Sequence, residues 1–290
     1  MQRAAQAFGS AFIGGNVETI RALMTRDAQS NFTPEKAHQM LAAIALGRGH
    51  VQAFEVVHTY VVDATGTGTQ VKALCGLLKN NDWVAVAANI GVRQAHVLLA
   101  AHARNSELAF SVWLLLEDGQ WKVHLSNLST SSIAGRDAEA IFALAKEERS
   151  AGHDFTAALL YGTLRDLVDR GAAFQLGITQ TIAEDASTFK VPPELEGPAP
   201  FEWRLGDATY KVSAISPVGA EGKLGLVFVL PHETWPGQTQ VDEANRRFLT
   251  AFVAAHPDAA RVFGFFVASA EMPDHSGGFR TVYKVGEGLH

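Results

Sequence analysis

The spacing of hydrophobic positions changes near residue 51 from a helical period to strict alternation. Between residues 2 and 25, apolar side chains recur every three to four positions, which predicts two short helices. The pair Thr33-Pro34 is typical of a helix N-terminus, with the proline in the first turn, so a further helix is expected over residues 33–46. The chain therefore begins with helices.

Alternating patterns after residue 51 predict a series of strands. In the run 54–62, every second side chain would lie on one face, including His58 and Tyr60. Three further strand-like runs follow, and the pair Asp118-Gly119 between the last two favours the tight turn of a β-hairpin. These runs are 92–104, 107–117 and 120–128. The apolar stretch 74–92 is compatible with either a helix or a strand.

The order of helices and strands over residues 1–132 resembles the cone-shaped α+β superfamily of nuclear-transport-factor-2-like proteins. The resemblance is carried by the hairpin over residues 112–123, in which Trp113 and Trp121 flank the turn, and is closest to small bacterial members of unassigned function. It implies a curved antiparallel sheet around a pocket, and homodimerisation through the open face of that sheet. The superfamily includes enzymes and binding modules, so the fold alone does not decide the function.

The second half of the chain predicts a helical connector, a linker and another α+β domain. Amphipathic patterns over 137–149 and 155–170 predict a helical hairpin, and the prolines after Val191 predict little regular structure there. A β-β-β-α-β-β order follows, for which we assign no family resemblance. Its sheet is expected to be mostly antiparallel, with one helix behind it. The complete prediction is an α+β protein with four parts: 1–132, the connector 133–175, the linker 176–200 and the C-terminal domain 201–290.

The composition of the chain argues against several classes of function and structure. The 290 residues carry 24 Lys and Arg against 30 Asp and Glu, a net charge of −6, which argues against a nucleic-acid-binding protein. The lone Cys75 excludes an intrachain disulfide and a cysteine-based zinc site. No run approaches the roughly 20 apolar residues of a membrane-spanning helix. The chain as written is expected in the cytoplasm, or in the cell envelope if an export signal was removed.

One acid–base constellation can be assembled from the N-terminal domain. His58, Tyr60 and His96, with Asp63 at the rim, would supply a titratable group and a proton acceptor on the inner face of the sheet. The competing interpretation of His58 is a core histidine with one hydrogen bond. None of the eleven histidines falls in a metal-binding motif, and neither a metal nor another cofactor is expected.

In the C-terminal domain, His232, Glu233 and Trp235 stand in a loop bracketed by two prolines, a setting in which recognition residues are common. The competing interpretation is a rigid turn with Trp235 folded over the sheet edge.

These observations favour a two-domain binding or interaction protein without catalysis, whose partner is a small apolar molecule or another protein. The alternative is a small-molecule hydrolase or isomerase that uses the N-terminal pocket with His58 as general base. A third hypothesis is a structural subunit that docks a partner through its exposed aromatic loops.

Overall fold

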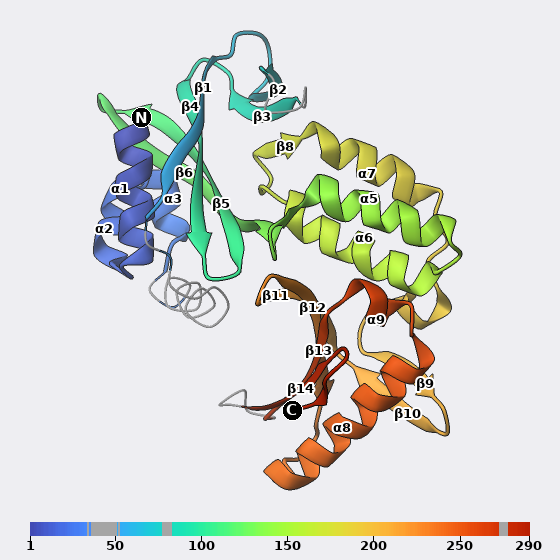
Figure 1. Cartoon of the computed structure of the whole chain (residues 1–290). Helices are drawn as coiled ribbons and strands as arrows, with labels where there is room; N and C mark the ends of the chain where they lie inside the picture. The colour runs from blue at the N-terminus through green and yellow to red at the C-terminus, as the bar shows by residue number, and fades with distance from the viewer. Residues whose placement is uncertain (34, 36–50, 52, 77–82, 273–277) are drawn as a thin grey trace. The chain divides into compact units, whose positions relative to one another are not determined.

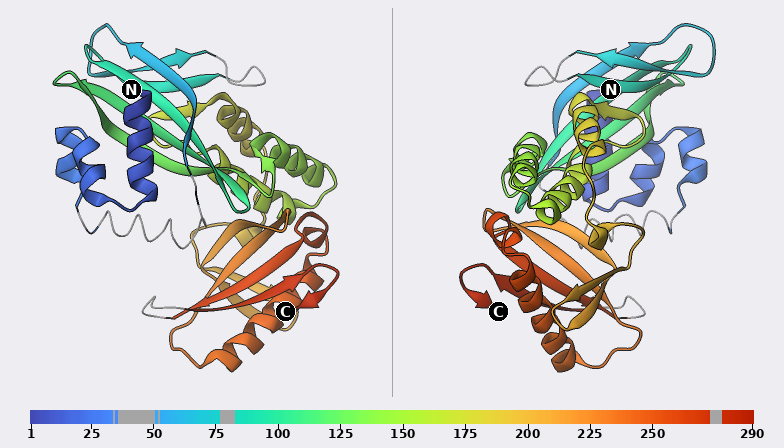
Figure 2. Two further views of the ribbon diagram at one scale, coloured as in Figure 1. Left: turned by 60° about the vertical axis from the view of Figure 1, so that its left-hand side comes forward. Right: turned by 90° about the vertical axis from the view of Figure 1, so that its right-hand side faces the viewer.

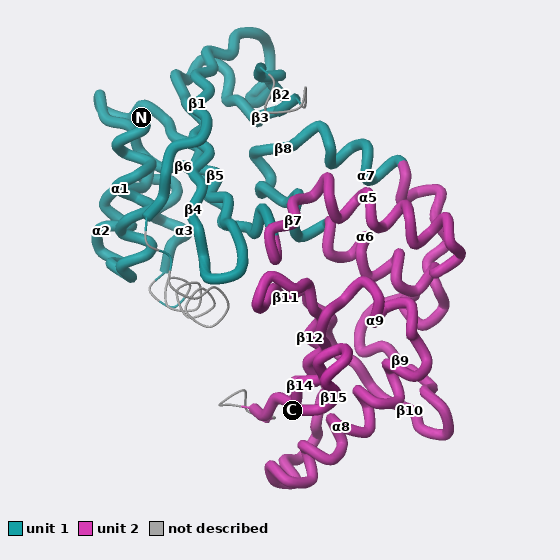
Figure 3. Tube along the Cα trace, in the orientation of Figure 1, with its two compact units in different colours: residues 1–132, 165–184 teal, residues 133–164, 185–290 magenta. Residues whose placement is uncertain are grey.

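The computed structural model describes residues 1–33, 35, 51, 53–76, 83–272 and 278–290 (Figure 1). It has a mixed α+β fold and divides into two compact units (Figure 3). Unit 1 comprises Met1–Ser132 and Arg165–Glu184, and unit 2 comprises Ile133–Leu164 and Asp185–His290. The first boundary coincides with the predicted one, whereas the predicted connector and linker are divided between the two units.

Unit 1 begins with three helices and continues as two antiparallel sheets. A curved sheet has the strand order β1-β4-β5-β6, and a smaller sheet has the order β2-β3-β8 (Figure 1). The helices are α1 (Gln2–Ile13), α2 (Val17–Leu23) and α3 (Arg26–Asn31). The strands are β1 (Glu55–Asp63), β2 (Gln70–Cys75), β3 (Val84–Asn89), β4 (Arg93–Ala103), β5 (Ser106–Glu117), β6 (Gln120–Ile133) and β8 (Phe174–Leu176).

The predicted N-terminal helices are confirmed as α1 and α2. The side chain of Asn16 accepts a hydrogen bond from the Thr19 amide at 3.0 Å and so caps α2. Six-residue α3 was not predicted, because it is too short for a hydrophobic period to show. The helix predicted over 33–46 lies outside the described residues.

The first core of unit 1, here called the helix-side core, lies between α1 and the curved sheet. Its aromatic centre is Phe110 of β5, whose ring centroid lies 5.8 Å from that of Phe8 and 5.1 Å from that of Phe12. Aromatic pairs at such distances stabilise a core beyond their buried area. The buried members are Ala5, Phe8, Ala11, Phe12, Ile20, Phe54, Val97, Leu99, Ala101, Leu108, Phe110, Val112, Leu114 and Val123.

The opposite face of the curved sheet contributes to a second core, here called the β8-side core. Its buried members are Val84, Val86, Leu98, Ala109, Phe174 and Leu176. The undecided stretch 74–92 is therefore resolved, within the described residues, as β2 and β3, and β3 pairs with β8. The residues of β8 come from the segment Arg165–Glu184, so this segment completes unit 1.

A β-bulge in β1 changes which side chains share a face. Val56 lies opposite Leu99 and His58 lies opposite Leu98, so Val57 is an extra residue in the strand. Since Leu99 belongs to the helix-side core and Leu98 to the β8-side core, the strand switches faces at the bulge. The expectation that alternate side chains of the whole run share one face is therefore wrong.

The predicted hairpin between β5 and β6 is confirmed. Asp118 and Gly119 both have positive φ angles, 51° and 74°, as a tight primed turn requires. Asp and Gly tolerate this backbone region better than most residues, and this is why the sequence pattern was informative.

Unit 2 contains the larger part of a helical hairpin and two further sheets. Its helices are α5 (Ala138–Ser150), α6 (Asp154–Val168), the single-turn 3₁₀ helix η2 (Pro193–Leu195), α8 (Gln238–Ala255) and α9 (Ala259–Val262). Its strands are β7 (Arg136–Asp137), β9 (Phe201–Leu205), β10 (Ala208–Val212), β11 (Ala214–Ala220), β12 (Lys223–Pro231), β13 (Phe265–Glu271), β14 (Gly278–Lys284) and β15 (Gly288–Leu289). Helix α7 (Gly177–Ser187), like α6, contributes residues to both units.

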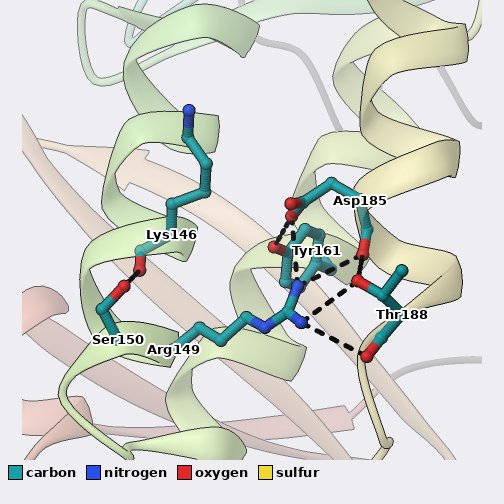
Figure 4. Close-up of polar contacts among 6 residues, drawn as sticks. All are labelled: Lys146, Arg149, Ser150, Tyr161, Asp185 and Thr188. Atoms are coloured by element: carbon teal, nitrogen blue, oxygen red, sulfur yellow. Dashed lines mark hydrogen bonds and ion pairs between the residues drawn. The ribbon is translucent and has the colours of Figure 1, made fainter.

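The predicted helical hairpin is confirmed as α5 and α6, and α7 was not predicted. Figure 4 shows how Arg149 of α5 joins these helices within unit 2. Its Nη1 donates to the carbonyl of Asp185 at 3.2 Å, and its Nη2 donates to the carbonyl and hydroxyl of Thr188 at 3.2 and 3.1 Å. The hydroxyl of Tyr161, on α6, donates to the carboxylate of Asp185. These bonds fix the end of α7 against the hairpin.

The main sheet of unit 2 has the strand order β11-β12-β13-β14-β15 and is mostly antiparallel, as predicted, with one parallel pair. β12 and β13 pair parallel because α8 connects them as a crossover, whereas an antiparallel pair would need only a hairpin. α8 packs along this sheet against β13 and β14 (Figure 2). The strand predicted over 208–216 is split at Ser213, and its first half pairs with β9 in a separate two-stranded sheet.

None of the helices in the described part of the chain combines the length and the hydrophobicity that crossing a membrane requires.

Candidate functional site

The structure brings three of the four predicted acid–base residues to one face of the curved sheet. Tyr60 and His96 are direct cross-strand partners in the β1–β4 pair, and the ring of His58 stacks beside that of Tyr60 with centroids 6.0 Å apart. The ring of Phe174, on β8, lies 6.2 Å from Tyr60 and 6.3 Å from His96. Asp63, the last residue of β1, makes no hydrogen bond or ion pair with the other three.

His96 is held as a neutral core histidine. His96 is only 1% exposed, and its ring stacks on that of Trp113 with centroids 5.2 Å apart. Its Nε2 lies 2.8 Å from the carbonyl oxygen of Ala87. A carbonyl oxygen can only accept, so Nε2 donates. Burial lowers the pKa of His96 to about 4, because the charged ring would lose its hydration. At neutral pH this side chain is a hydrogen-bond donor to the backbone.

Two adjoining cavities lie in unit 1, and His96 lines the smaller of them. The larger, of about 560 Å³, is bounded by Lys72, by Ala85 to Ala87 on β3, by Thr179 and by residues of the segment 165–175. The smaller, of about 120 Å³, is lined by His96, Trp113 and Asn127 among others. Both cavities share the wall formed by residues 170–174. The other predicted residues of this group, His58, Tyr60 and Asp63, line neither cavity.

The shared wall is positioned by the end of α6. After Val168 the chain turns, with the carboxylate of Asp169 accepting a hydrogen bond from the Gly171 amide at 2.8 Å. Gly171 has a φ of +78°, a conformation that glycine adopts without steric cost. The turn leads directly into β8, and Phe174 enters the β8-side core.

Arg170 is the charged residue of this wall, and it is 7% exposed. Its Nη1 donates to the Ser129 hydroxyl at 3.0 Å and to the carbonyls of Leu167 and Asp169 at 2.9 and 2.7 Å. Its own carbonyl accepts from the Ser111 hydroxyl at 2.7 Å. Burial lowers the pKa of Arg170 to about 10, so the side chain remains a cation at neutral pH.

Further charged side chains surround the larger cavity. Lys72 donates from Nζ to the side-chain oxygen of Gln175 at 3.2 Å, and Arg165, Asp166 and Asp169 also line the cavity. Burial raises the pKa of the Asp166 carboxyl.

Sequence reasoning missed Arg170 and Phe174. The only local signal was the Arg-Gly pair at the end of a helical pattern, which indicates a helix stop and not a cavity wall.

The second group of predicted residues lies in the loop between β12 and α8 of unit 2. The rings of His232 and Trp235 meet edge to face with centroids 6.2 Å apart, and Glu233 is exposed. Nε2 of His232 is buried and has no hydrogen-bond partner among the described residues. A binding role for this loop stays a prediction.

Because His96 is buried, the free energy of unfolding is expected to depend on pH. Its pKa is about 4 when folded and about 6.5 when unfolded, so the folded chain binds fewer protons between these values. Its contribution to stability is complete above pH 6.5 and is lost as the pH falls towards 4. We expect a loss of about 3 kcal/mol over this range, measurable by urea denaturation at several pH values.

The control is His96→Asn, which keeps an N–H donor but does not titrate. The difference in unfolding free energy between the wild type and this variant should shrink as the pH falls from 6.5 to 4. A difference that is independent of pH would mean that folding does not lower the pKa of His96.

No group of three or more His, Cys, Asp or Glu side chains is arranged to hold a metal ion in the residues that the structure describes. Comparison of the chain with known protein families and with curated proteins gives no match.

Proposed function

We propose that unit 1 is a binding module for a small molecule, which occupies the two adjoining cavities without being chemically changed. The observation that carries this proposal is the shared wall 170–174, which lines both cavities and presents a buried cation, Arg170, together with an aromatic ring, Phe174. The proposal does not extend to unit 2.

The dimensions and lining of the larger cavity support a small ligand over a protein partner. A volume of about 560 Å³ falls within the range typical of small-molecule sites. Such sites combine apolar walls with a few placed polar groups that orient the ligand. Here the apolar part comes from Val86 and Phe174, and the polar part comes from Lys72, Asp166 and Arg170.

Hydrogen exchange of the full chain tests this proposal. A ligand found in a library of small-molecule fragments should slow amide exchange in peptides that cover 165–179 and β3, and should leave peptides of α8 and β13 unchanged. If no fragment protects the cavity peptides, the proposal fails.

A matched pair of variants locates the bound ligand. Ala172 is exposed and lines both cavities, so Ala172→Trp should obstruct them and weaken binding by about tenfold or more. Ala208 is an exposed alanine on β10, and Ala208→Trp should leave the affinity unchanged. Equal affinities for the two variants would place the ligand elsewhere.

The enzyme hypothesis keeps one specific observation in its favour. The Tyr60 hydroxyl is buried without a hydrogen-bond partner among the described residues, and His58 stacks beside it, so a titratable ring lies next to an uncommitted donor. If a bound ligand is turned over, and His58→Ala abolishes turnover without changing its affinity, unit 1 is a hydrolase or isomerase with His58 as general base.

A further inference from the structure

One edge of the buried guanidinium of Arg170 makes no hydrogen bond with any described residue. All of its side-chain hydrogen bonds come from Nη1, which binds the Ser129 hydroxyl and two carbonyls at the end of α6. The opposite edge, formed by Nε and Nη2, carries two parallel N–H groups. Neither Nε nor Nη2 is among the fully enclosed side-chain atoms that lack a partner in the described residues, so this edge is reached by solvent and can be reached by a ligand.

Arg170 also lacks a carboxylate partner within the described part of the chain. The carboxylate of Asp169 is the charge that most supports the cation, but its Oδ1 accepts from the Gly171 amide, and the two side chains form no ion pair. A buried charge without a partner is costly, and an oppositely charged group at hydrogen-bonding distance would reduce this cost.

We propose that the Nε/Nη2 edge of Arg170 binds the carboxylate of a small organic acid, whose apolar body lies against Phe174. A guanidinium edge and a carboxylate match in geometry, since two parallel N–H groups meet two oxygens. Arg170 and Phe174 line both cavities, so the acid could be held from either. This inference rests on the proposed function, because it names the ligand class of the same site.

The charges around the larger cavity favour a monoanion over a phosphate. Its lining carries three cations, Lys72, Arg165 and Arg170, and two acidic side chains, Asp166 and Asp169. When both carboxyls are ionised at neutral pH, the lining has one excess positive charge, which a monoanion neutralises. A phosphate dianion would add a charge that the two carboxylates repel. A phosphate also presents a tetrahedral group where the guanidinium edge is planar.

Pairs of nearly isosteric probes test the inference on the full chain. Benzoate should bind about tenfold or more tightly than benzamide, and hexanoate more tightly than hexanamide, as measured by calorimetry. Inorganic phosphate should bind more weakly than benzoate. Hydrogen exchange of peptides covering 165–179 identifies the site in each case.

Variants then assign the preference to one side chain. Arg170→Gln removes the charge and should bring benzoate and benzamide to similar affinities, while the affinity for benzamide stays within about twofold. Arg170→Lys keeps the charge but cannot form bidentate hydrogen bonds, so it should retain only part of the preference for benzoate over benzamide. Arg93→Gln removes an exposed cation of unit 1 that lines neither cavity and serves as the control, with the preference unchanged.

The outcomes separate this inference from the proposed function. If benzoate and benzamide bind the cavity equally well, the cavity is a binding site but Arg170 does not select acids, and the inference fails alone. If phosphate outcompetes benzoate and Arg170→Lys binds it as well, the site selects charge and not the carboxylate shape. If a library fragment protects the cavity peptides but none of these probes does, the inference fails alone, whereas if no fragment protects them the proposed function fails and the inference with it. Should Arg170→Gln not fold, the wild-type probe pairs and Arg170→Lys still decide.

Discussion

Replacing Trp203 by alanine is expected to lower the free energy of unfolding of unit 2 by about 3–5 kcal/mol. Trp203, on β9, is 1% exposed, and its ring lies 5.5 Å from that of Phe155 and 5.9 Å from that of Phe252. It also contacts Phe228 and Phe248, so one side chain joins the small sheet to the hairpin, to the main sheet and to α8. Truncation would leave a cavity among rigid rings, which cannot collapse to fill it.

Hydrogen exchange in the presence of urea measures this loss in the full chain and assigns it to peptides of unit 2. Trp235→Ala is the control, since Trp235 is only half-buried and should cost far less. Trp203→Phe should fall between the two, because it keeps most of the ring but loses the bond from Nε1 to the Glu194 carbonyl at 2.7 Å. Equal losses for Trp203→Ala and Trp235→Ala would contradict the central position of Trp203.

The elements predicted correctly from the sequence are those that local chemistry specifies. The β5–β6 hairpin follows from two residues that accept positive φ, and α1 and α2 follow from their hydrophobic spacing. These features depend on neighbours in the chain, so one sequence is enough to reveal them.

The face of β1 could not be predicted, because a bulge adds one residue without changing composition. Val57 reverses the alternation, and His58 therefore faces the β8-side core with Tyr60 and not the helix-side core with Val56. His58, Tyr60 and His96 therefore share one face from residue 58 onwards, although the pattern that suggested this began four residues earlier.

The candidate site itself depends on contacts between distant parts of the chain. Ser129 meets Arg170 across 41 residues, and Ser111 meets the Arg170 carbonyl across 59. Neither serine carries a signal that identifies its partner, and the segment around Arg170 has the pattern of an ordinary helix end. The parallel β12–β13 pair was not predicted for the same reason, because it also depends on distant contacts. The direction of these strands follows from where α8 packs and not from the sequences of the strands themselves.

Replacing Gly171 by alanine is expected to destabilise unit 1 by about 2–5 kcal/mol, from two separate causes. Its φ of +78° is unfavourable for any residue with a Cβ atom. A Cβ atom at this position would also lie 2.6 Å from Cβ of Asn127, on β6, which forces one strand or the turn to shift. Because Gly171 belongs to the shared wall, the same change should weaken ligand binding in the cavities.

Gly91→Ala separates these two causes. Gly91 also lies in unit 1 and has a nearly identical φ of +73°, but a Cβ atom there meets nothing within 4 Å. It should therefore cost about 1–2 kcal/mol and leave binding unchanged. The remaining difference between the variants measures the contact with Asn127, and Asn127→Gly, which removes the opposing Cβ, should recover part of it in the double variant. If Gly171→Ala costs no more than Gly91→Ala, the turn is not packed closely against β6 and the shared wall is free to move.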